Sequence, residues 1–397
     1  MPIAPKSFAF TVVLGVLAAL PVLSIDISAP TLALLPQQLG TSATLASMTL
    51  TLFMVGFALG QLSGGLSDRL GRRPVLLAGL TCYTLAGIAC TLAESGGALA
   101  LFRLIQGAGA GACSVLAFTM VQDLFEGDDA RSKRSYVTVI FGAVPILAPA
   151  LGSVLTNLAG WRSVHGVLGA AGGALLAVIW FGVAESRPIR PKVAVTTDPV
   201  GNARLRDDPR FVGIALANAL SYGAIFAYIA GSPIVIIGQM GLSSGIFAGV
   251  FACTASAMIA GAWTSGRLSR RNVAATALLN PALLVAAAAT VTLAGVSLCG
   301  VTLGVVLIPL LLVTMFTRGI AAPNLQHLAI DRQRQRAGAA SAAVGISQIL
   351  SGALASGAVA VLLPVLGPSA IAVPMALLAA AALIVWRWVS RPGARLI

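Results

Sequence analysis

Residues 64–74 read Gly-Gly-Leu-Ser-Asp-Arg-Leu-Gly-Arg-Arg-Pro, a short basic segment between an apolar run that ends near residue 66 and another that begins at residue 75. A weaker copy, Ser-Gly-Arg-Leu-Ser-Arg-Arg, occupies residues 265–271. The two copies are half a chain length apart, and their basic residues coincide. This spacing indicates that the chain consists of two repeated halves.

The composition indicates a membrane protein. Hydrophobic residues make up 58% of the 397 residues and charged residues only 9%, whereas a soluble domain carries about a quarter charged residues. A helix needs about 20 apolar residues to cross a bilayer, and lipid offers no partner for an unpaired backbone group, so the apolar runs are predicted to be helices. The predicted spans are residues 8–36, 44–66, 75–93, 97–122, 136–158, 163–184, 210–237, 243–265, 273–296, 298–321, 337–363 and 367–389. We therefore expect an all-α membrane protein with twelve transmembrane helices.

Basic residues gather on one side of these spans. With a cytoplasmic N-terminus, the inner loops and ends hold the segment 187–210 and Lys6, Arg69, Arg72, Arg73, Arg131, Lys133, Arg134, Arg267, Arg270, Arg271, Arg332, Arg334, Arg336, Arg387, Arg391 and Arg395. The outer loops hold only Arg162. Positive charge is typical of cytoplasmic loops, so both termini are predicted to be cytoplasmic. The net charge of +13 is then attributed to this rule and to anionic lipid heads, and not to nucleic-acid binding.

The longest polar segment lies at the midpoint of the chain. Residues 185–208 run from Glu-Ser-Arg-Pro to Arg-Leu-Arg-Asp-Asp and are either a simple loop or a cytoplasmic linker between two bundles. The repeat favours a linker, with pseudo-symmetric six-helix bundles at residues 1–184 and 209–397. In transporters built from parallel repeats, the substrate site lies between the halves near the middle of the bilayer.

Several of these segments together resemble the major facilitator superfamily, and more narrowly the Bcr/CflA branch of bacterial drug:proton antiporters. The matching segments are the loop 64–74, Arg-Leu-Ile-Gln-Gly-Ala-Gly at 103–109, Ser-Ile-Asp-Ile-Ser-Ala-Pro at 24–30 and Glu-Ser at 185–186. The sequence departs from the branch at Ser28, where an aromatic residue is frequent, and in residues 148–152, which retain only part of the antiporter helix motif through Pro149 and Gly152. The resemblance implies a multi-pass transporter of the bacterial inner (plasma) membrane.

The resemblance also implies a role for the loop at residues 64–74. In the family this loop is a cytoplasmic latch that holds the two halves in the outward-facing state. The corresponding residues here are Gly64, Asp68, Arg69, Gly71 and Arg72. Asp123, at the predicted inner end of span four, is expected to pair with Arg72. The alternative is a set of solvated surface charges, which stabilise a fold very little.

Three charged residues, Asp26, Arg103 and Arg318, lie deep within apolar runs, where charge is costly and usually functional. We expect Asp26 to be the proton-coupling site, because burial favours a neutral carboxyl group and a nearby cation favours the ionised one. The alternative is a static ion pair with Arg103. For Arg103 we expect a switchable partner of Asp26 or a substrate contact, against a snorkelling anchor. Arg318 either snorkels to the cytoplasmic interface or is a second-half counterpart of Arg103 that recognises an acidic substrate.

Further cavity candidates follow from helical spacing. Asn218, Tyr222 and Phe226 recur every four residues, which places an amide, a phenol and a ring on one helix face. Such a face suits a cavity for an amphipathic ligand, although aromatic packing between helices explains it equally well. Gln106 lies one turn after Arg103 and either lines the cavity or joins two helices by a hydrogen bond.

The predicted function is secondary active export. The sequence has no Gly-x-x-x-x-Gly-Lys-[Ser/Thr] loop for a nucleotide, so transport must draw on an ion or substrate gradient. We expect export of small, mostly hydrophobic drugs or metabolites in exchange for protons by alternating access. The alternatives are a proton symporter or uniporter for a nutrient, and a non-transporting receptor or scaffold. No enzymatic activity, metal or organic cofactor is expected, and the expected partners are a small-molecule substrate, protons and lipids, with a monomer sufficient for function.

Overall fold

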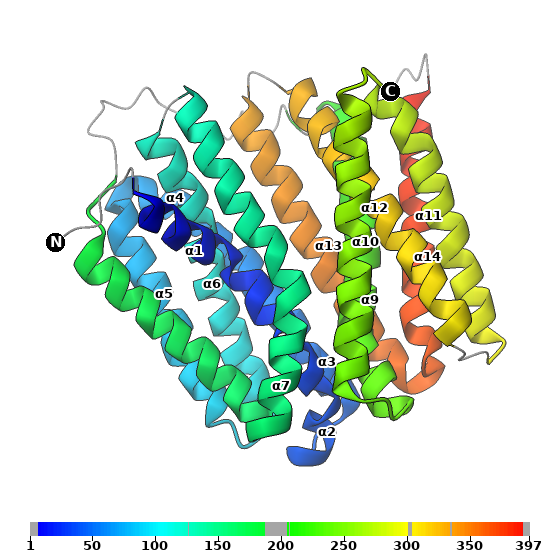
Figure 1. The fold of residues 1–397 in the computed structure, drawn as a ribbon, viewed down its shortest axis with the longest axis horizontal. Helices are drawn as coiled ribbons and strands as arrows, with labels where there is room; N and C mark the ends of the chain where they lie inside the picture. The colour runs from blue at the N-terminus through cyan, green and yellow to red at the C-terminus, as the bar shows by residue number, and fades with distance from the viewer. Residues whose placement is uncertain are drawn as a thin grey trace. The chain divides into compact units, whose positions relative to one another are not determined.

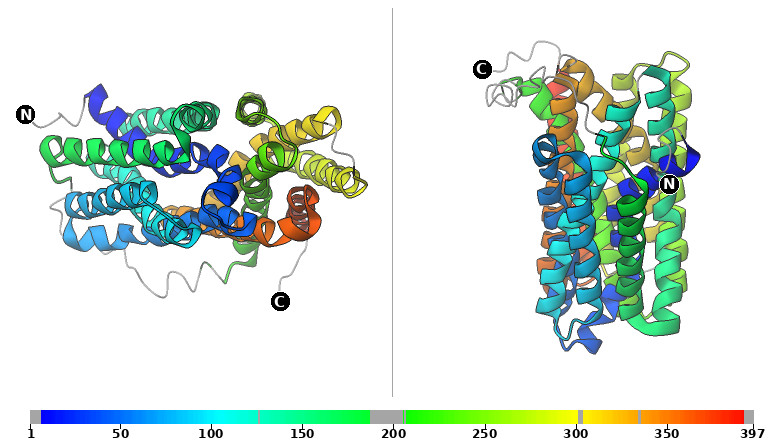
Figure 2. Two further views of the ribbon diagram at one scale, coloured as in Figure 1. Left: turned by 90° about the horizontal axis from the view of Figure 1, so that it is seen from below. Right: turned by 90° about the vertical axis from the view of Figure 1, so that its left-hand side faces the viewer.

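The computed structural model describes residues 7–125, 127–186, 205, 207–300, 304–333 and 336–391. All regular secondary structure in these ranges is helical, and Figures 1 and 2 draw the described chain without a strand. The helices are α1 (Phe8–Asp26), η1 (Ala29–Ala33), α2 (Leu35–Gln38), α3 (Ala43–Gln61), α4 (Ser63–Leu70), α5 (Arg72–Thr91), α6 (Gly96–Leu124), α7 (Gly127–Gly182), α9 (Pro209–Pro233), η2 (Ile234–Gln239), α10 (Ser244–Ser269), α11 (Ala275–Leu298), α12 (Gly304–Arg332), α13 (Ala337–Leu366) and α14 (Ser369–Ser390). The all-α prediction is confirmed for these residues.

Eleven helical segments within the described residues are long and apolar enough to cross a membrane. One of them, Gly142–Gly182, has 41 residues and belongs to α7. Its backbone leaves the helical conformation at Ala159 (φ −139°) and Gly160 (φ +75°), where the sequence predicts a loop between spans 136–158 and 163–184. The number of membrane crossings, twelve, and the location of the termini remain predictions.

The chain divides into two compact units. Unit 1 comprises residues 1–190 and 233–249, and unit 2 comprises residues 191–232 and 250–397. The predicted division into six-helix bundles at residues 1–184 and 209–397 remains a prediction. Most of the predicted linker, residues 187–204, lies outside the described residues.

In unit 1, α3 and α6 approach each other closely at glycines. A Cβ atom on Gly107 of α6 would meet the carbonyl oxygen of Phe53, and one on Gly56 of α3 would meet the carbonyl oxygen of Leu104. Helix backbones in membranes approach this closely only through small residues. This contact holds α6, which carries Arg103 one turn before Gly107, against α3.

The first predicted span is not one continuous helix. α1 ends at Asp26, and a short 3-10 helix, η1, follows with Pro30 in its first turn. Proline has no backbone N–H and disfavours a helical conformation in the residue before it, so an α-helix through residues 27–30 is unfavourable. The predicted span 8–36 therefore corresponds to one apolar helical segment, Phe8–Ala33, which changes from an α-helix that ends at Asp26 to the 3-10 helix η1.

Unit 2 has a shared apolar core contributed by α9, α11, α12, α13 and α14, with Phe211, Leu279, Leu325, Val344 and Trp386 among its buried residues. The indole Nε1 of Trp386 donates a hydrogen bond of 2.8 Å to Asn280 Oδ1. α9 continues into the π-helix η2, an irregularity that the sequence does not predict. The core fixes α9 and α12, which carry the polar residues of this unit.

Candidate functional site

Asp26 lies at the C-terminal end of α1, with only 2% of its surface exposed. Among the described residues, no lysine, arginine or histidine forms an ion pair with its carboxylate. The alternative of a static ion pair between Asp26 and Arg103 is therefore wrong for this structure. The Asp26 carboxyl group is therefore buried without a cationic partner among the described residues.

Arg103 on α6 is also 2% exposed. It contacts Ser24 and Ser28, which lie two residues before and two residues after Asp26. Its Nη2 donates to the carbonyl oxygen of Ser24 at 3.2 Å and to Ser28 Oγ at 3.1 Å. Ser28, the residue at which the sequence departs from the drug-antiporter branch, thus accepts a hydrogen bond from the buried guanidinium. Snorkelling of Arg103 to the interface is ruled out by its burial.

Gln106 is part of the same cluster. Arg103 Nη1 donates to Gln106 Oε1 at 3.0 Å, and Arg103 Cζ lies 4.2 Å from the centre of the Phe53 ring. Gln106 Nε2 is buried and has no hydrogen-bond acceptor among the described residues. The cluster therefore combines a fixed positive charge, an aromatic face and an unused amide donor next to the segment that holds Asp26.

The antiporter-type motif of α7 packs on this same segment. Pro149 is buried within α7. A Cβ atom on Gly152 would meet the carbonyl oxygen of Ile27, the residue after Asp26. Only glycine permits this approach of α7 to the end of α1, so the motif supports the backbone beside Asp26 in this structure.

Arg318 on α12 does not snorkel, which corrects the interfacial interpretation. It is 5% exposed, and its Nη1 donates to Asn218 Oδ1 at 3.1 Å and to Ser221 Oγ at 3.4 Å. Its Cζ lies 5.9 Å from the centre of the Tyr222 ring, which stacks on Phe226 with ring centres 4.7 Å apart. The residues predicted to share one face of α9 thus gather around Arg318 in unit 2.

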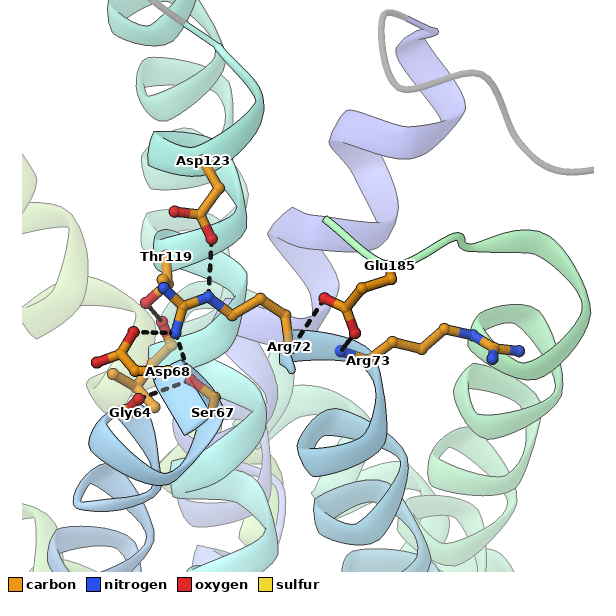
Figure 3. A network of polar contacts seen from close by, with 9 residues as sticks. Gly64, Ser67, Asp68, Arg72, Arg73, Thr119, Asp123 and Glu185 are labelled. Carbon is orange, nitrogen blue, oxygen red and sulfur yellow. Dashed lines mark hydrogen bonds and ion pairs between the residues drawn. The ribbon is translucent and has the colours of Figure 1, made fainter. Parts of the chain in front are cut away.

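Residues of α4, α5 and α6 form a polar network around Arg72, the first residue of α5 (Figure 3). Arg72 Nε lies 2.8 Å from Asp123 Oδ2, and Arg72 Nη1 lies 2.6 Å from Asp68 Oδ1 and 2.6 Å from Ser67 Oγ. We call Ser67, Asp68, Arg72 and Asp123 the Arg72 network. Arg72 is 8% exposed, so its charge is not solvated. The predicted ion pair with Asp123 is present.

Two further predicted loop residues lie beside this network. The carbonyl oxygen of Gly64 accepts a hydrogen bond of 2.6 Å from Ser67 Oγ, which positions that hydroxyl as an acceptor for Arg72. Arg69 lies on the exposed side of α4. The loop residues therefore differ in role: Gly64 contacts the network through Ser67, whereas Arg69 faces outward.

Glu185 binds the start of α5 beside this network, a contact that the sequence does not predict. Its carboxylate accepts hydrogen bonds from the backbone N–H groups of Arg72 (2.9 Å) and Arg73 (3.1 Å) at the start of α5. A carboxylate at a helix N-terminus pairs with unsatisfied N–H groups and a favourable dipole. Gly71 has φ +103°, and a Cβ atom there would crowd Glu185. The available signal was the position of Glu185 in the family-like Glu-Ser exit of span six.

The candidate residues thus form three clusters. Asp26, Arg103 and Gln106 lie near the end of α1, the Arg72 network lies at the α4–α5 loop, and Arg318 gathers with the α9 residues in unit 2. No group of three His, Cys, Asp or Glu side chains in the described ranges could hold a metal ion. The clusters present a buried carboxyl group at Asp26 and buried guanidinium and amide groups that can form hydrogen bonds.

Comparisons with known proteins agree with this arrangement. The sequence profile of the Major Facilitator Superfamily matches residues 14–356. The uncharacterized MFS-type transporter YdgK of Bacillus subtilis (strain 168) is 30% identical over 368 residues, 89% of each chain. A chloramphenicol resistance protein of Pseudomonas aeruginosa is 32% identical over 251 residues, 62% of this chain and 58% of that protein. The crystal structure of a bacterial homolog of the human lysosomal transporter Spinster, inward-facing and unoccupied, has a TM-score of 0.76 and 15% identity and covers 96% of both chains, which shows the fold alone.

The chain belongs to the Major Facilitator Superfamily. It is therefore a multi-pass membrane transporter and not an enzyme, as the sequence predicts. The resemblance to the Bcr/CflA branch is also confirmed, because relatives named for drug resistance align with more than half of the chain.

Proposed function

We propose that this protein exports small, mostly hydrophobic drugs or metabolites from the bacterial cytoplasm across the inner membrane in exchange for protons. The observation that carries the proposal is the position of Asp26. It is the only aspartate or glutamate among the buried residues of the described chain, and no described cation pairs with it. An intramembrane acidic group of this kind is the usual element of a proton pathway.

The coupling step uses the surroundings of Asp26. Protonation of a carboxyl group depends on its access to water and on nearby positive charge. Arg103 contacts Ser24 and Ser28 on either side of Asp26, so a shift of α1 relative to α6 changes both. In the proposed cycle Asp26 is deprotonated while the substrate is bound and protonated for the return step.

The proposed architecture has twelve spans in two six-helix bundles, with both termini in the cytoplasm. The apolar segment Gly142–Gly182 has 41 residues, and at 1.5 Å per residue this corresponds to about 60 Å of helix, twice the thickness of the hydrocarbon core. The non-helical residues Ala159 and Gly160 divide it near the middle. If this segment crosses the membrane twice, the chain has twelve membrane crossings and not eleven. An even number of crossings places both termini on the same side of the membrane.

The Arg72 network is proposed to act as a latch on the cytoplasmic side. It joins the end of α4, the start of α5 and the end of α6 through one buried guanidinium. A buried, multiply bonded cation costs more to release than an exposed ion pair. The network therefore favours one arrangement of these helix ends, and its release would accompany the change of access.

Export is tested in an efflux-deficient bacterium that expresses the wild type, Asp26→Asn or no transporter. A panel of antibiotics that includes chloramphenicol is used for growth inhibition and for cellular accumulation. We expect the wild type to lower accumulation of at least one compound, and both Asp26→Asn and an uncoupler to remove this effect. Expression that raises the accumulation of a compound in a proton-dependent manner would instead indicate symport and would contradict export.

A further inference from the structure

The Arg318 cluster in unit 2 contains more hydrogen-bond donors than its own residues can satisfy. We infer that Arg318 and Asn218 bind the carboxylate of an amphipathic aromatic substrate, an inference that rests on the proposed transport function and specifies its substrate class. The cluster comprises Arg318 on α12 with Asn218, Ser221 and Tyr222 on α9, all in the same unit.

Arg318 has only neutral hydrogen-bond partners in this cluster. Its Nη1 donates to Asn218 Oδ1 and Ser221 Oγ, and no carboxylate of the described chain forms an ion pair with it. A guanidinium has five N–H donors and no acceptor. A buried charge is unfavourable unless it is paired, so an anion that enters this cluster would replace a missing partner.

Asn218 adds an independent observation. Its side chain is fully buried, and its Nδ2 has no acceptor among the described residues although its Oδ1 accepts from Arg318. An unsatisfied buried donor is costly and rare in folded proteins. A carboxylate has two oxygens, which can accept from the Arg318 guanidinium and from this amide at the same time.

The neighbouring rings indicate the rest of the ligand. Tyr222 lies beside the guanidinium and stacks on the buried Phe226. Apolar and aromatic walls with a few polar groups are typical of small-molecule sites. An aromatic ring attached to the carboxylate would contact this pair.

The similar cluster in unit 1 is better satisfied. Arg103 also bonds a carboxamide and faces a ring, but its second terminal nitrogen donates to Ser24 and Ser28. Only one terminal nitrogen of Arg318 donates to a described residue. The amide nitrogens of Gln106 and Asn218 both lack an acceptor, so it is the unsatisfied guanidinium nitrogen of Arg318 that selects unit 2 for the anion site.

Binding of 2-naphthoate and its neutral isostere 2-naphthamide to the purified full chain in detergent micelles tests the inference by calorimetry. We expect naphthoate to bind the wild type at least about tenfold more tightly, as a hydrogen-bonded charge pair would give. Arg318→Gln should remove this preference, whereas Arg267→Gln, at an exposed arginine of α10, should retain it. Equal affinities for the two ligands, or a preference that survives Arg318→Gln, would overturn the inference.

A second variant addresses the chance that Arg318→Gln does not fold. Asn218→Asp keeps the shape of the side chain and places an internal carboxylate at the position that now lies 3.1 Å from Arg318. We expect a higher melting temperature without ligand and loss of naphthoate binding. Unchanged naphthoate affinity in a folded Asn218→Asp protein would overturn the inference.

These binding measurements need no proton gradient. If chloramphenicol export is proton-driven but naphthoate binds no more tightly than naphthamide, the proposed carboxylate site at Arg318 is wrong and the proposed export function stands. If naphthoate is preferred but no compound is exported, only the proposed export function is wrong.

Discussion

Arg72 Nε lies 2.8 Å from Asp123 Oδ2, which joins the start of α5 to the end of α6 across 51 positions of the sequence. The Arg72 side chain is 9% exposed and the Asp123 side chain 13%. The ion pair is therefore largely removed from water. In contrast, the second carboxylate on Arg72, that of Asp68, is 55% exposed.

Asp123→Asn should destabilise the protein more than Asp68→Asn. Loss of the buried charge partner leaves Arg72 poorly satisfied and should cost about 1–3 kcal/mol. Loss of the exposed partner should cost no more than about 1 kcal/mol. The measurement is thermal unfolding of both purified variants in the same detergent, and a larger loss from Asp68→Asn would contradict the assignment of Asp123 as the main partner.

Gly71→Ala should also destabilise the loop. The positive φ of Gly71 is unfavourable for alanine, at about 1–3 kcal/mol, and the new Cβ would crowd Glu185. Gly65→Ala, in the same loop motif, is the matched control, because a Cβ atom there meets nothing within 4 Å. Melting temperatures of the two variants provide the comparison, and equal values would show that the Gly71–Glu185 contact is unimportant.

Part of this site follows from the sequence. Charged residues are rare in the chain, so the basic loop at residues 64–74 and Asp123 at the end of a long apolar run already limit the partners of Arg72. The same rarity identifies Asp26, Arg103 and Arg318 as buried charges. Local sequence also predicts the break in α7 near residue 160, since the apolar segment is too long for one crossing.

The rest depends on how the helices are rotated, which the sequence leaves open. Helices that are apolar on all sides give no periodic pattern from which to choose a buried face. For this reason snorkelling of Arg318 could not be distinguished from its observed contact with Asn218. The sequence does not indicate the contact of Glu185 for a related reason, because its partners are backbone N–H groups of α5, which almost any residue type provides.

Gly107→Ala tests the close packing of α6 on α3. The added Cβ would meet the backbone of Phe53, and overpacking of this kind costs about 1–3 kcal/mol. Gly97→Ala on the same helix is the control, since nothing lies within 4 Å of its Cβ position. We expect a lower melting temperature and weaker transport for Gly107→Ala alone. Wild-type stability of Gly107→Ala would exclude close packing at this position.

Asp208 predicts a pH dependence of stability outside the membrane spans. Burial alone would raise the pKa of the Asp208 carboxyl, but hydrogen bonds from Arg332 and from the backbone of Phe211 and Arg210 outweigh it, so the pKa lies below its usual value. A carboxyl group with a lowered pKa in the folded state stabilises the protein above its unfolded-state pKa, and this contribution is lost as the pH falls through the folded-state pKa.

Asp208→Asn should therefore lower the melting temperature at pH 7, and the difference from the wild type should shrink as the pH is lowered below about 4. Asp207→Asn, at an exposed neighbour, serves as the control. A difference that stays constant down to pH 3 would contradict the assigned ion pair with Arg332.

Proton movement that accompanies drug movement is the most direct test of the central claim, exchange of a proton for the drug at Asp26. Proteoliposomes with a pH-sensitive dye inside are loaded with an exported compound from the screen and diluted into drug-free buffer. For the wild type and Asp207→Asn we expect the interior to become acidic as the drug leaves, and for Asp26→Asn we expect no pH change. Three results would contradict the account. In the wild type, the drug could leave without proton entry, or protons could leave together with the drug. In Asp26→Asn, exchange of drug for protons could continue at the wild-type rate.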